Sequence, residues 1–264
     1  MRVRVLFFGM LKELTGKSAE FMDMPSGSTA SALLERCVAE FPGVTQALSS
    51  VAIAVNEQYA DPDMKLNEND EVALLPPVSG GAANAQDGSR ASDLAGSKSG
   101  SSPEVRIAIT SEPIRTAEII ESLKRGEDGA SVVFEGIVRN QTGGRKTLFL
   151  DYEAYEEMAL GQMQSLAAQA VREFPVREVA MVHRLGRLEI GETSVLIVVA
   201  SAHRKAAFEA CHWLIDTLKR TVPIWKKEHF EDGAVWADGE PFPPEIPRAN
   251  SSGLGSPANG PASK

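Results

Sequence analysis

The 264-residue chain is 43% hydrophobic and has a net charge of −9 and a pI near 5.1. This composition allows one large core or two ordinary ones, and it argues against a nucleic-acid binder with the usual basic surface. No apolar run approaches the roughly 18 residues of a membrane span, so no membrane insertion is expected. Cys37 and Cys211 lack metal-ligand spacing, which indicates two core thiols in a reducing cytoplasm.

The first eighty residues follow the order strand, strand, helix, strand, strand. Strands are predicted at 2–8, 19–24 and 51–55, the helix at 28–41, and a turn followed by a last strand within 67–77. Apolar residues recur at helical spacing within 28–41, with Ser28 or Thr29 as the N-cap. This order fits a small sheet wrapped around one helix.

The stretch "LLPPVSGG" ends this first region at Gly81. Two glycines lack side chains, so such a tail can either thread a narrow channel or make a plain interdomain turn. Residues 82–103 consist mostly of alanine, serine and glycine, which predicts a flexible linker. The expected domains are therefore 1–81 and 104–248, and residues 249–264 are expected to form a disordered tail.

The second region interleaves strands and helices. Strands are predicted at 105–110, 130–140, 147–155, 177–186 and 193–202, helices at 116–125, 156–174 and 204–222, and a hairpin at 224–238. The hairpin turns at Asp232 and Gly233. Nothing in the pattern demands a doubly wound parallel sheet, so we expect an α+β sandwich.

Several cationic side chains stand at element ends in this acidic second region. Arg139 follows a strand, His203 and Arg204 begin a helix, Lys219 lies near the end of that helix, and Lys226 and Lys227 follow it. Each alone is typical of a solvated charge or of a partner for the helix dipole. Together they favour a small phosphorylated substrate.

Four motifs, "SVVFEGIVRN", "MVHRLGRLEIGE", "SAHRKAAFEA" and "KRTVPIWKKE", resemble the large catalytic subunit of molybdopterin synthase over residues 105–238. The first region, with its "PPVSGG" end, resembles the small sulfur-carrier subunit of the same enzyme. The resemblance implies an N-terminal ubiquitin-like β-grasp domain, fused through a linker to a catalytic α/β sandwich.

The resemblance also implies an activity. Gly81 would carry a thiocarboxylate, and its sulfur would pass to cyclic pyranopterin monophosphate to form the dithiolene of molybdopterin, with Lys219 and Lys226 as catalytic residues. The substrate-binding positions would be Ile137, Val138, Arg139, His203, Arg204, Lys219, Lys226, Lys227 and Glu228. No cofactor or metal, no nucleic acid and no membrane is expected, while an adenylating and sulfurating enzyme would act on Gly81.

Two questions remain open from the sequence. Gly81 is joined to Ala82, so either a protease cuts after Gly81 or the first domain is a tethered lookalike served by a separate carrier. The alternative function is a non-enzymatic sulfur-carrier and pterin-docking fusion. Helix 204–222 would hold His203 and Lys219 roughly 24 Å apart, which predicts a homodimer with shared sites.

Overall fold

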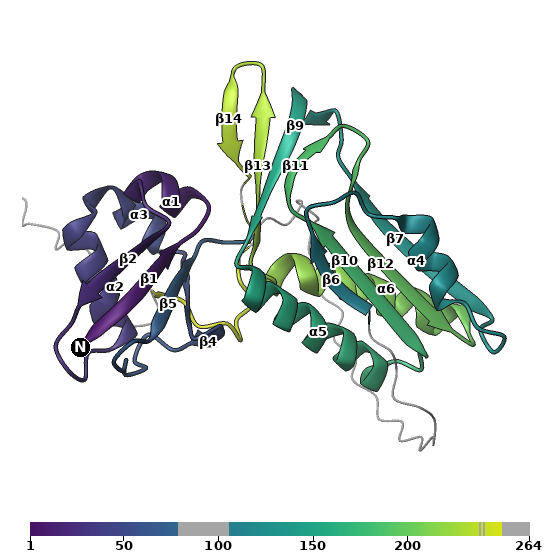
Figure 1. The fold of residues 1–264 in the computed structure, drawn as a ribbon, viewed down its shortest axis with the longest axis horizontal. Helices are drawn as coiled ribbons and strands as arrows, with labels where there is room; N and C mark the ends of the chain where they lie inside the picture. Colours follow the sequence, from purple (N-terminus) through teal and green to yellow (C-terminus); the bar gives the residue numbers. More distant parts are fainter. Residues whose placement is uncertain (79–105, 238, 240, 250–264) are drawn as a thin grey trace, which may run out of the picture. The chain divides into compact units, whose positions relative to one another are not determined.

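A computed structural model describes residues 1–78, 106–237, 239 and 241–249. These residues form two compact units, Met1–Pro77 together with the segment from Phe242 onward, and Val78–Pro241. Both units combine helices with mixed sheets, so the predicted α+β class is confirmed (Figure 1). Gly80, Gly81 and the predicted linker 82–103 lie outside the described residues.

Unit 1 is a five-stranded sheet with one main helix. Its elements are β1 (Arg2–Phe7), α1 (Met10–Thr15), β2 (Ala19–Asp23), α2 (Ala30–Glu40), η1 (Pro42–Val44), α3 (Thr45–Leu48), β3 (Ala52–Val55), β4 (Gln58–Ala60) and β5 (Glu71–Leu75). The strand order is β2-β1-β5-β3-β4. β1 and β5 are parallel and the other neighbours antiparallel, as expected for a ubiquitin-like β-grasp domain.

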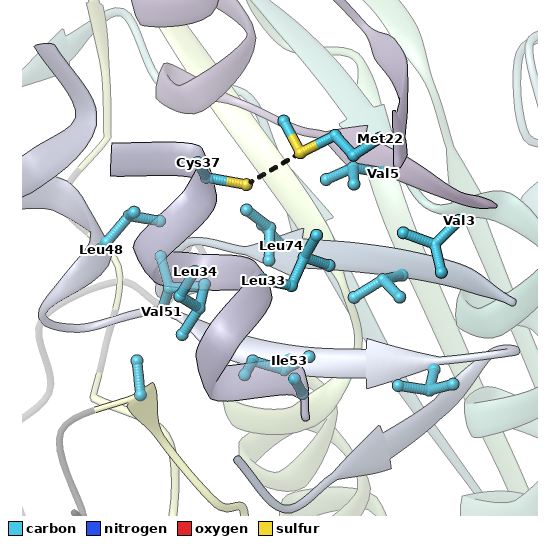
Figure 2. Close-up of a cluster of buried hydrophobic side chains, with 14 of the residues drawn as sticks. Val3, Val5, Met22, Leu33, Leu34, Cys37, Leu48, Val51, Ile53 and Leu74 are labelled. Carbon is cyan, nitrogen blue, oxygen red and sulfur yellow. Dashed lines mark hydrogen bonds between the residues drawn. The ribbon is translucent and has the colours of Figure 1, made fainter. Parts of the chain in front are cut away.

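Helix α2 forms the core of unit 1 by burying one face on the sheet. Thr29 is its N-cap and accepts a hydrogen bond from the Ala32 N–H, which satisfies one free donor of the first turn. Figure 2 shows Leu33 and Cys37 pointing into the cluster, where the Cys37 thiol lies 3.8 Å from the Met22 sulfur. Burial raises the pKa of Cys37 to about 12, so this thiol is a core residue, as predicted.

The short helix α1 was missed by sequence reasoning, which left 10–15 unassigned. Gly9 precedes it with a φ of 52°, and Gly16 ends it in the left-handed region with a φ of 69°. Six residues hold fewer than two helical turns, so the apolar period is too short to detect. β4 was also missed, because only three residues form it.

The end of the described chain corrects a predicted boundary. Residues up to 248 were assigned to the second domain and Ala249 to a disordered tail, yet 242–249 belong to unit 1. Phe242 is 2% exposed and Ala249 is 7% exposed. The reason is that apolar side chains in this proline-rich stretch cover part of the unit 1 surface, an association that carries no periodic signal.

Unit 2 contains two sheets. The four-stranded sheet has the order β6 (Arg106–Thr110), β10 (Glu178–Arg184), β12 (Thr193–Ser201), β7 (Ala130–Ile137). The second has the order β11 (Gly186–Glu189), β9 (Arg145–Ala154), β13 (Ile224–Phe230), β14 (Gly233–Trp236), and β8 (Gln141–Thr142) pairs with β9. Only β6 and β10 pair in parallel among the described strands of this unit.

Helices cover both faces of the four-stranded sheet. α5 (Glu156–Glu173) and α6 (Arg204–Thr221) bury one face, with Val195, Ile197 and Val199 of β12 in the shared core. α4 (Thr116–Leu123) packs on the other face against Leu196 and Val198. This alternation along β12 makes the predicted sandwich (Figure 1). No described helix is both long and apolar enough to cross a bilayer.

The predicted strand 177–186 corresponds to β10, and the strand that follows it, β11, was not predicted. β10 ends at Arg184 in the first sheet, and β11 begins at Gly186 in the second. Gly186 has a φ of 78°, a conformation that glycine adopts without steric cost. The chain therefore changes sheets at Leu185, and this turn connects the two sheets of unit 2.

Candidate active site

Helix α6 gives the candidate site its geometry, because it runs back along the strand that precedes it. β12 pairs with β7 so that Ser201 lies opposite Ala130 and Thr193 opposite Ile137. α6 begins just after Ser201 and packs on both strands. Its last turn therefore lies toward the end of β7 at Ile137, and its first turn lies toward Ala130.

A contact in the middle of α6 confirms this direction. Cys211 is buried there and receives a hydrogen bond from the backbone of Phe134, a residue in the middle of β7. Burial raises the pKa of Cys211 to about 11, against the smaller opposing effect of that hydrogen bond. The thiol is a packing residue, as predicted.

His203 and Lys219 consequently lie at opposite ends of α6. His203 is the N-cap residue and Arg204 the first helical residue, and both are exposed. Lys219 is half-buried in the last turn. At about 1.5 Å per residue the two ends are roughly 24 Å apart, as predicted.

The strand after α6 brings a second lysine into place. Val222 and Pro223 connect α6 to β13, and the Pro223 carbonyl accepts a hydrogen bond of 3.1 Å from the Tyr155 N–H. Lys226 Nζ lies 2.9 Å from Oε1 of Glu228, and the two side chains are 17% and 6% exposed. Lys226 is thus held by an ion pair that is largely removed from water.

Glu228 has a further acceptor available. Its Oε2 is buried and has no hydrogen-bond partner among the described residues. A buried acceptor without a partner costs free energy, and a bound donor would remove that cost. The carboxylate can therefore position Lys226 through one oxygen and accept a substrate N–H or O–H through the other.

The third part of the site is the end of β7. Val138 is buried, its N–H donates to the Glu192 carbonyl at 3.0 Å, and its carbonyl accepts from the Gly191 N–H at 2.9 Å. Ile137 is 53% exposed and Arg139 is exposed. The backbone is thus held firmly while the Arg139 guanidinium remains open to a ligand.

Tyr152, which pairs with Lys226 across the sheet, and His183, which contacts Tyr152, were missed by sequence reasoning. Tyr152 lies directly opposite Lys226 in the β9–β13 pairing, and its ring contacts the His183 ring edge-on at 5.2 Å. Burial lowers the pKa of His183 to about 4, so the ring is neutral at pH 7. Its Nδ1–H donates to the Arg184 carbonyl at 3.0 Å. The only sequence signal was a histidine within a buried strand.

The structure therefore divides the predicted site residues. Lys226 and Glu228 lie together, and Lys219 and Arg139 lie toward the same end of unit 2. Lys227 points to the other face of β13, where its ammonium lies 5.6 Å from the centre of the Trp236 ring. Gly81 is outside the described residues.

Other surfaces of unit 2 offer weaker candidates. A hollow of about 480 Å³ is lined by residues that include Asn140, Lys146 and Ile190. No residue of α6 or β13 lines this hollow, so we do not take it as the centre of the site. Within the described ranges, no three His, Cys, Asp or Glu side chains gather as metal ligands would.

Comparison with known proteins matches the two halves of the chain separately. The ThiS family matches residues 5–81, and the MoaE protein family matches residues 109–221. The molybdopterin synthase catalytic subunit of Bacillus subtilis is 45% identical over 131 residues, which cover 50% of this chain and 83% of that protein. The subunit of the same name from Homo sapiens is 39% identical over 130 residues, covering 49% of this chain and 69% of that protein.

The second half is also similar to a solved structure. The crystal structure of molybdopterin synthase from Staphylococcus aureus is 43% identical, with a TM-score of 0.47, and covers 48% of this chain and 93% of that chain. The family resemblances predicted from the motifs are confirmed for both halves, and the first match ends at Gly81.

Proposed function

The chain belongs to the family of molybdopterin synthase catalytic subunits, and we propose that it transfers sulfur from a thiocarboxylate at its own Gly81. Its role lies in molybdenum cofactor biosynthesis, and its catalytic half is an enzyme. The acceptor in this proposal is cyclic pyranopterin monophosphate, which takes two sulfurs in succession to form the dithiolene of molybdopterin.

One observation carries this proposal. The match to the sulfur-carrier family ends at Gly81, and the match to the catalytic family follows in the same chain at residue 109. A sulfur donor and the enzyme that uses it are thus parts of one polypeptide. The diglycine has a chemical purpose in this arrangement, because a side chain at Gly81 would obstruct entry into a narrow site.

The described geometry supports separate roles for the cations. Lys219 and Lys226 are half-buried, so their charges act in a medium less polar than water and can stabilise negative charge that develops during transfer. Arg139 is exposed and suited to hold the phosphate of the pterin. Glu228 fixes Lys226 and accepts a hydrogen bond from the bound pterin.

The remaining predicted positions complete the binding site in this proposal. Ile137 and Val138 shape the wall beside Arg139, while Lys227, on the other face of β13, adds positive charge without touching the pterin. His203 and Arg204 contribute from the far end of α6, which one small ligand cannot span together with Lys219. We therefore propose a homodimer in which one subunit supplies the lysines and its partner supplies His203 and Arg204.

The fusion requires a processing step in this proposal. Gly81 is followed by Ala82, and a thiocarboxylate needs a free carboxyl group at Gly81. A protease that cuts after Gly81 would expose it, and an adenylating and sulfurating enzyme would then act on it. We place these reactions in the reducing cytoplasm, where thiocarboxylates and the thiols of Cys37 and Cys211 persist.

The alternative is a non-enzymatic fusion that binds pterin and takes no part in the chemistry, with sulfur supplied by a separate carrier. The ion pair between Lys226 and Glu228 favours the enzyme, because a purely electrostatic docking surface has no need for a lysine held away from water. In the alternative, a separate carrier supplies the sulfur, so the identity of residue 81 would not affect molybdopterin formation.

Replacing Gly81 tests the proposal directly. We expect Gly81→Phe to abolish sulfur transfer when no other carrier protein is present, while Gly88→Phe, placed beyond the cut, keeps full activity. Intact-mass measurement of the wild-type protein from its own host should show a chain split after Gly81, with one oxygen of the new terminus replaced by sulfur. Full activity of Gly81→Phe in this assay would contradict the proposal, because sulfur would then be transferred without a glycine at position 81.

A further inference from the structure

The segment 242–249 follows unit 2 in the chain but packs entirely within unit 1. It reads "FPPEIPRA". The segment is thus part of neither the predicted linker nor the catalytic half. The segment makes backbone and apolar contacts with the carrier domain, and these indicate a specific association. Further hydrogen bonds lie within the segment itself.

The backbone of the segment extends the sheet of unit 1. The Ala249 N–H donates to the Val51 carbonyl at 3.1 Å, and Arg248 pairs with Ala52 in an antiparallel bridge. β4 covers this side of β3 only from Ile53 onward, so the segment occupies the edge that β4 leaves open. Addition of a strand to an open sheet edge is a common mode of peptide recognition.

Apolar side chains anchor the segment. Phe242 is 2% exposed and packs edge-on against the ring of Tyr59 on β4, with ring centres 5.9 Å apart. Ile246 is 9% exposed, and Ala249 joins the core cluster of unit 1. Figure 2 shows Val51 in that cluster, on the backbone that receives the segment. Burial raises the pKa of the Tyr59 phenol above its ordinary value.

The backbone of the segment is restricted by its prolines and by hydrogen bonds within the segment. Pro243, Pro244 and Pro247 restrict its backbone, and the Ile246 N–H closes a turn on the Pro243 carbonyl at 3.0 Å. Arg248 Nη2 donates to the Phe242 carbonyl at 2.8 Å, which joins the two ends of the segment. A stiff peptide loses little conformational entropy on docking.

We propose that residues 242–249 are a docking segment that recognises the β3–β4 edge of the carrier domain and holds that domain without the covalent linker. Its use rests on the proposed function, in which the chain is cut after Gly81. After that cut the segment stays with the catalytic half, and its partner is the chain's own carrier domain. The cut carrier therefore remains bound to the enzyme that takes its sulfur.

A cut in the linker of the full-length protein tests this proposal. A recognition sequence for a site-specific protease is inserted within 82–103, the purified protein is cut, and the affinity of the two pieces is measured after separation and remixing. The test variant is Phe242→Ala with Ile246→Ala, and the matched control is Glu245→Ala, an exposed residue of the same segment. We expect the double variant to raise the dissociation constant at least about 30-fold, and the control to leave it unchanged.

The design separates binding from folding. All substitutions lie on the longer piece, so the carrier piece keeps its natural sequence. The three tryptophans, Trp213, Trp225 and Trp236, all belong to unit 2 and report whether the longer piece remains folded. An unchanged dissociation constant in the folded double variant would overturn the proposal, as would wild-type pieces that fail to associate at micromolar concentration.

The assay needs no sulfur, so its failure differs from failure of the proposed function. Wild-type pieces that bind through the segment while Gly81→Phe remains fully active would uphold the docking segment and reject Gly81 as donor. If instead the segment does not affect binding of the pieces while Gly81→Phe is inactive, the docking segment would be rejected and Gly81 upheld as donor.

Discussion

The two ends of α6 carry cations in very different surroundings. At the last turn, Lys219 is half-buried, and the strand that follows holds Lys226 in an ion pair with Glu228. At the first turn, His203 and Arg204 are exposed beside the end of β12. One chain thus builds the lysine end by its own packing, but it leaves the histidine end open to water.

This difference separates residues that a single chain can position from residues that need another surface. A half-buried cation has already lost part of its hydration, so its attraction to a developing negative charge is stronger than in water. An exposed arginine or histidine keeps its hydration and its freedom until a partner covers it. The lysine end is therefore suited to the chemical step, and the histidine end to a function completed by a second copy.

Removal of Lys219 should have the largest effect. We expect Lys219→Ala to lower the single-turnover rate by about 10²- to 10³-fold with little change in pterin affinity, because in the proposed mechanism its charge acts chiefly on the transition state. Arg139→Ala should chiefly weaken pterin binding. Lys124→Ala, an exposed cation at the end of α4, is the control and should have no effect.

Single-turnover rates and pterin affinity, measured for all three variants, decide this assignment. A normal rate with weakened affinity in Lys219→Ala would make that lysine an anion anchor like Arg139. The contrast between the two ends of α6 would then concern binding alone.

The packing behind Lys226 should depend on pH. His183 contacts Tyr152, and burial lowers its folded-state pKa from 6.5 to about 4. Below pH 6.5 His183 becomes protonated in the unfolded chain. In the folded chain it stays neutral until the pH reaches about 4. The contribution of neutral His183 to the free energy of unfolding is therefore fully present above pH 6.5, and about 3 kcal/mol of it is lost by pH 4.

Tryptophan fluorescence during denaturant unfolding isolates unit 2 for this measurement. His183→Phe keeps an aromatic ring beside Tyr152 but cannot titrate, so its stability should change less between pH 7 and pH 4 than that of the wild type. His212→Ala removes an exposed histidine of α6. It should retain the wild-type dependence of unfolding free energy on pH. Identical slopes in all three proteins would show that His183 does not control this loss.

The sequence was sufficient where a pattern is local and periodic. It predicted α2 with either Ser28 or Thr29 as its cap, α6 with both of its charged ends, and the burial of Cys211. These features depend on the spacing of residues along one helix, so they can be predicted without knowing what the helix packs against.

Features that depend on pairing between distant segments could not be predicted. The change of sheet at Leu185 depends on which strand pairs with β11, and the partner of Glu228 depends on which face of β13 turns inward. The contact between His183 and Tyr152 joins strands of two different sheets. Residues 242–249 lack any period because prolines interrupt them, so only the surface that receives them reveals their place.

The smallest expected change, a partial recovery of activity, gives the sharpest test of the comparison. In the proposed dimer each site takes Lys219 from one subunit and His203 from its partner, so homodimers of Lys219→Ala and of His203→Ala should both be nearly inactive. Subunit exchange between them makes half of the dimers mixed. Each mixed dimer has one site with both substitutions and one site with neither, so activity should recover to about a quarter of wild type. If exchange is demonstrated and activity stays absent, both ends of α6 cannot serve one shared site, and the exposed charges at the histidine end have another role.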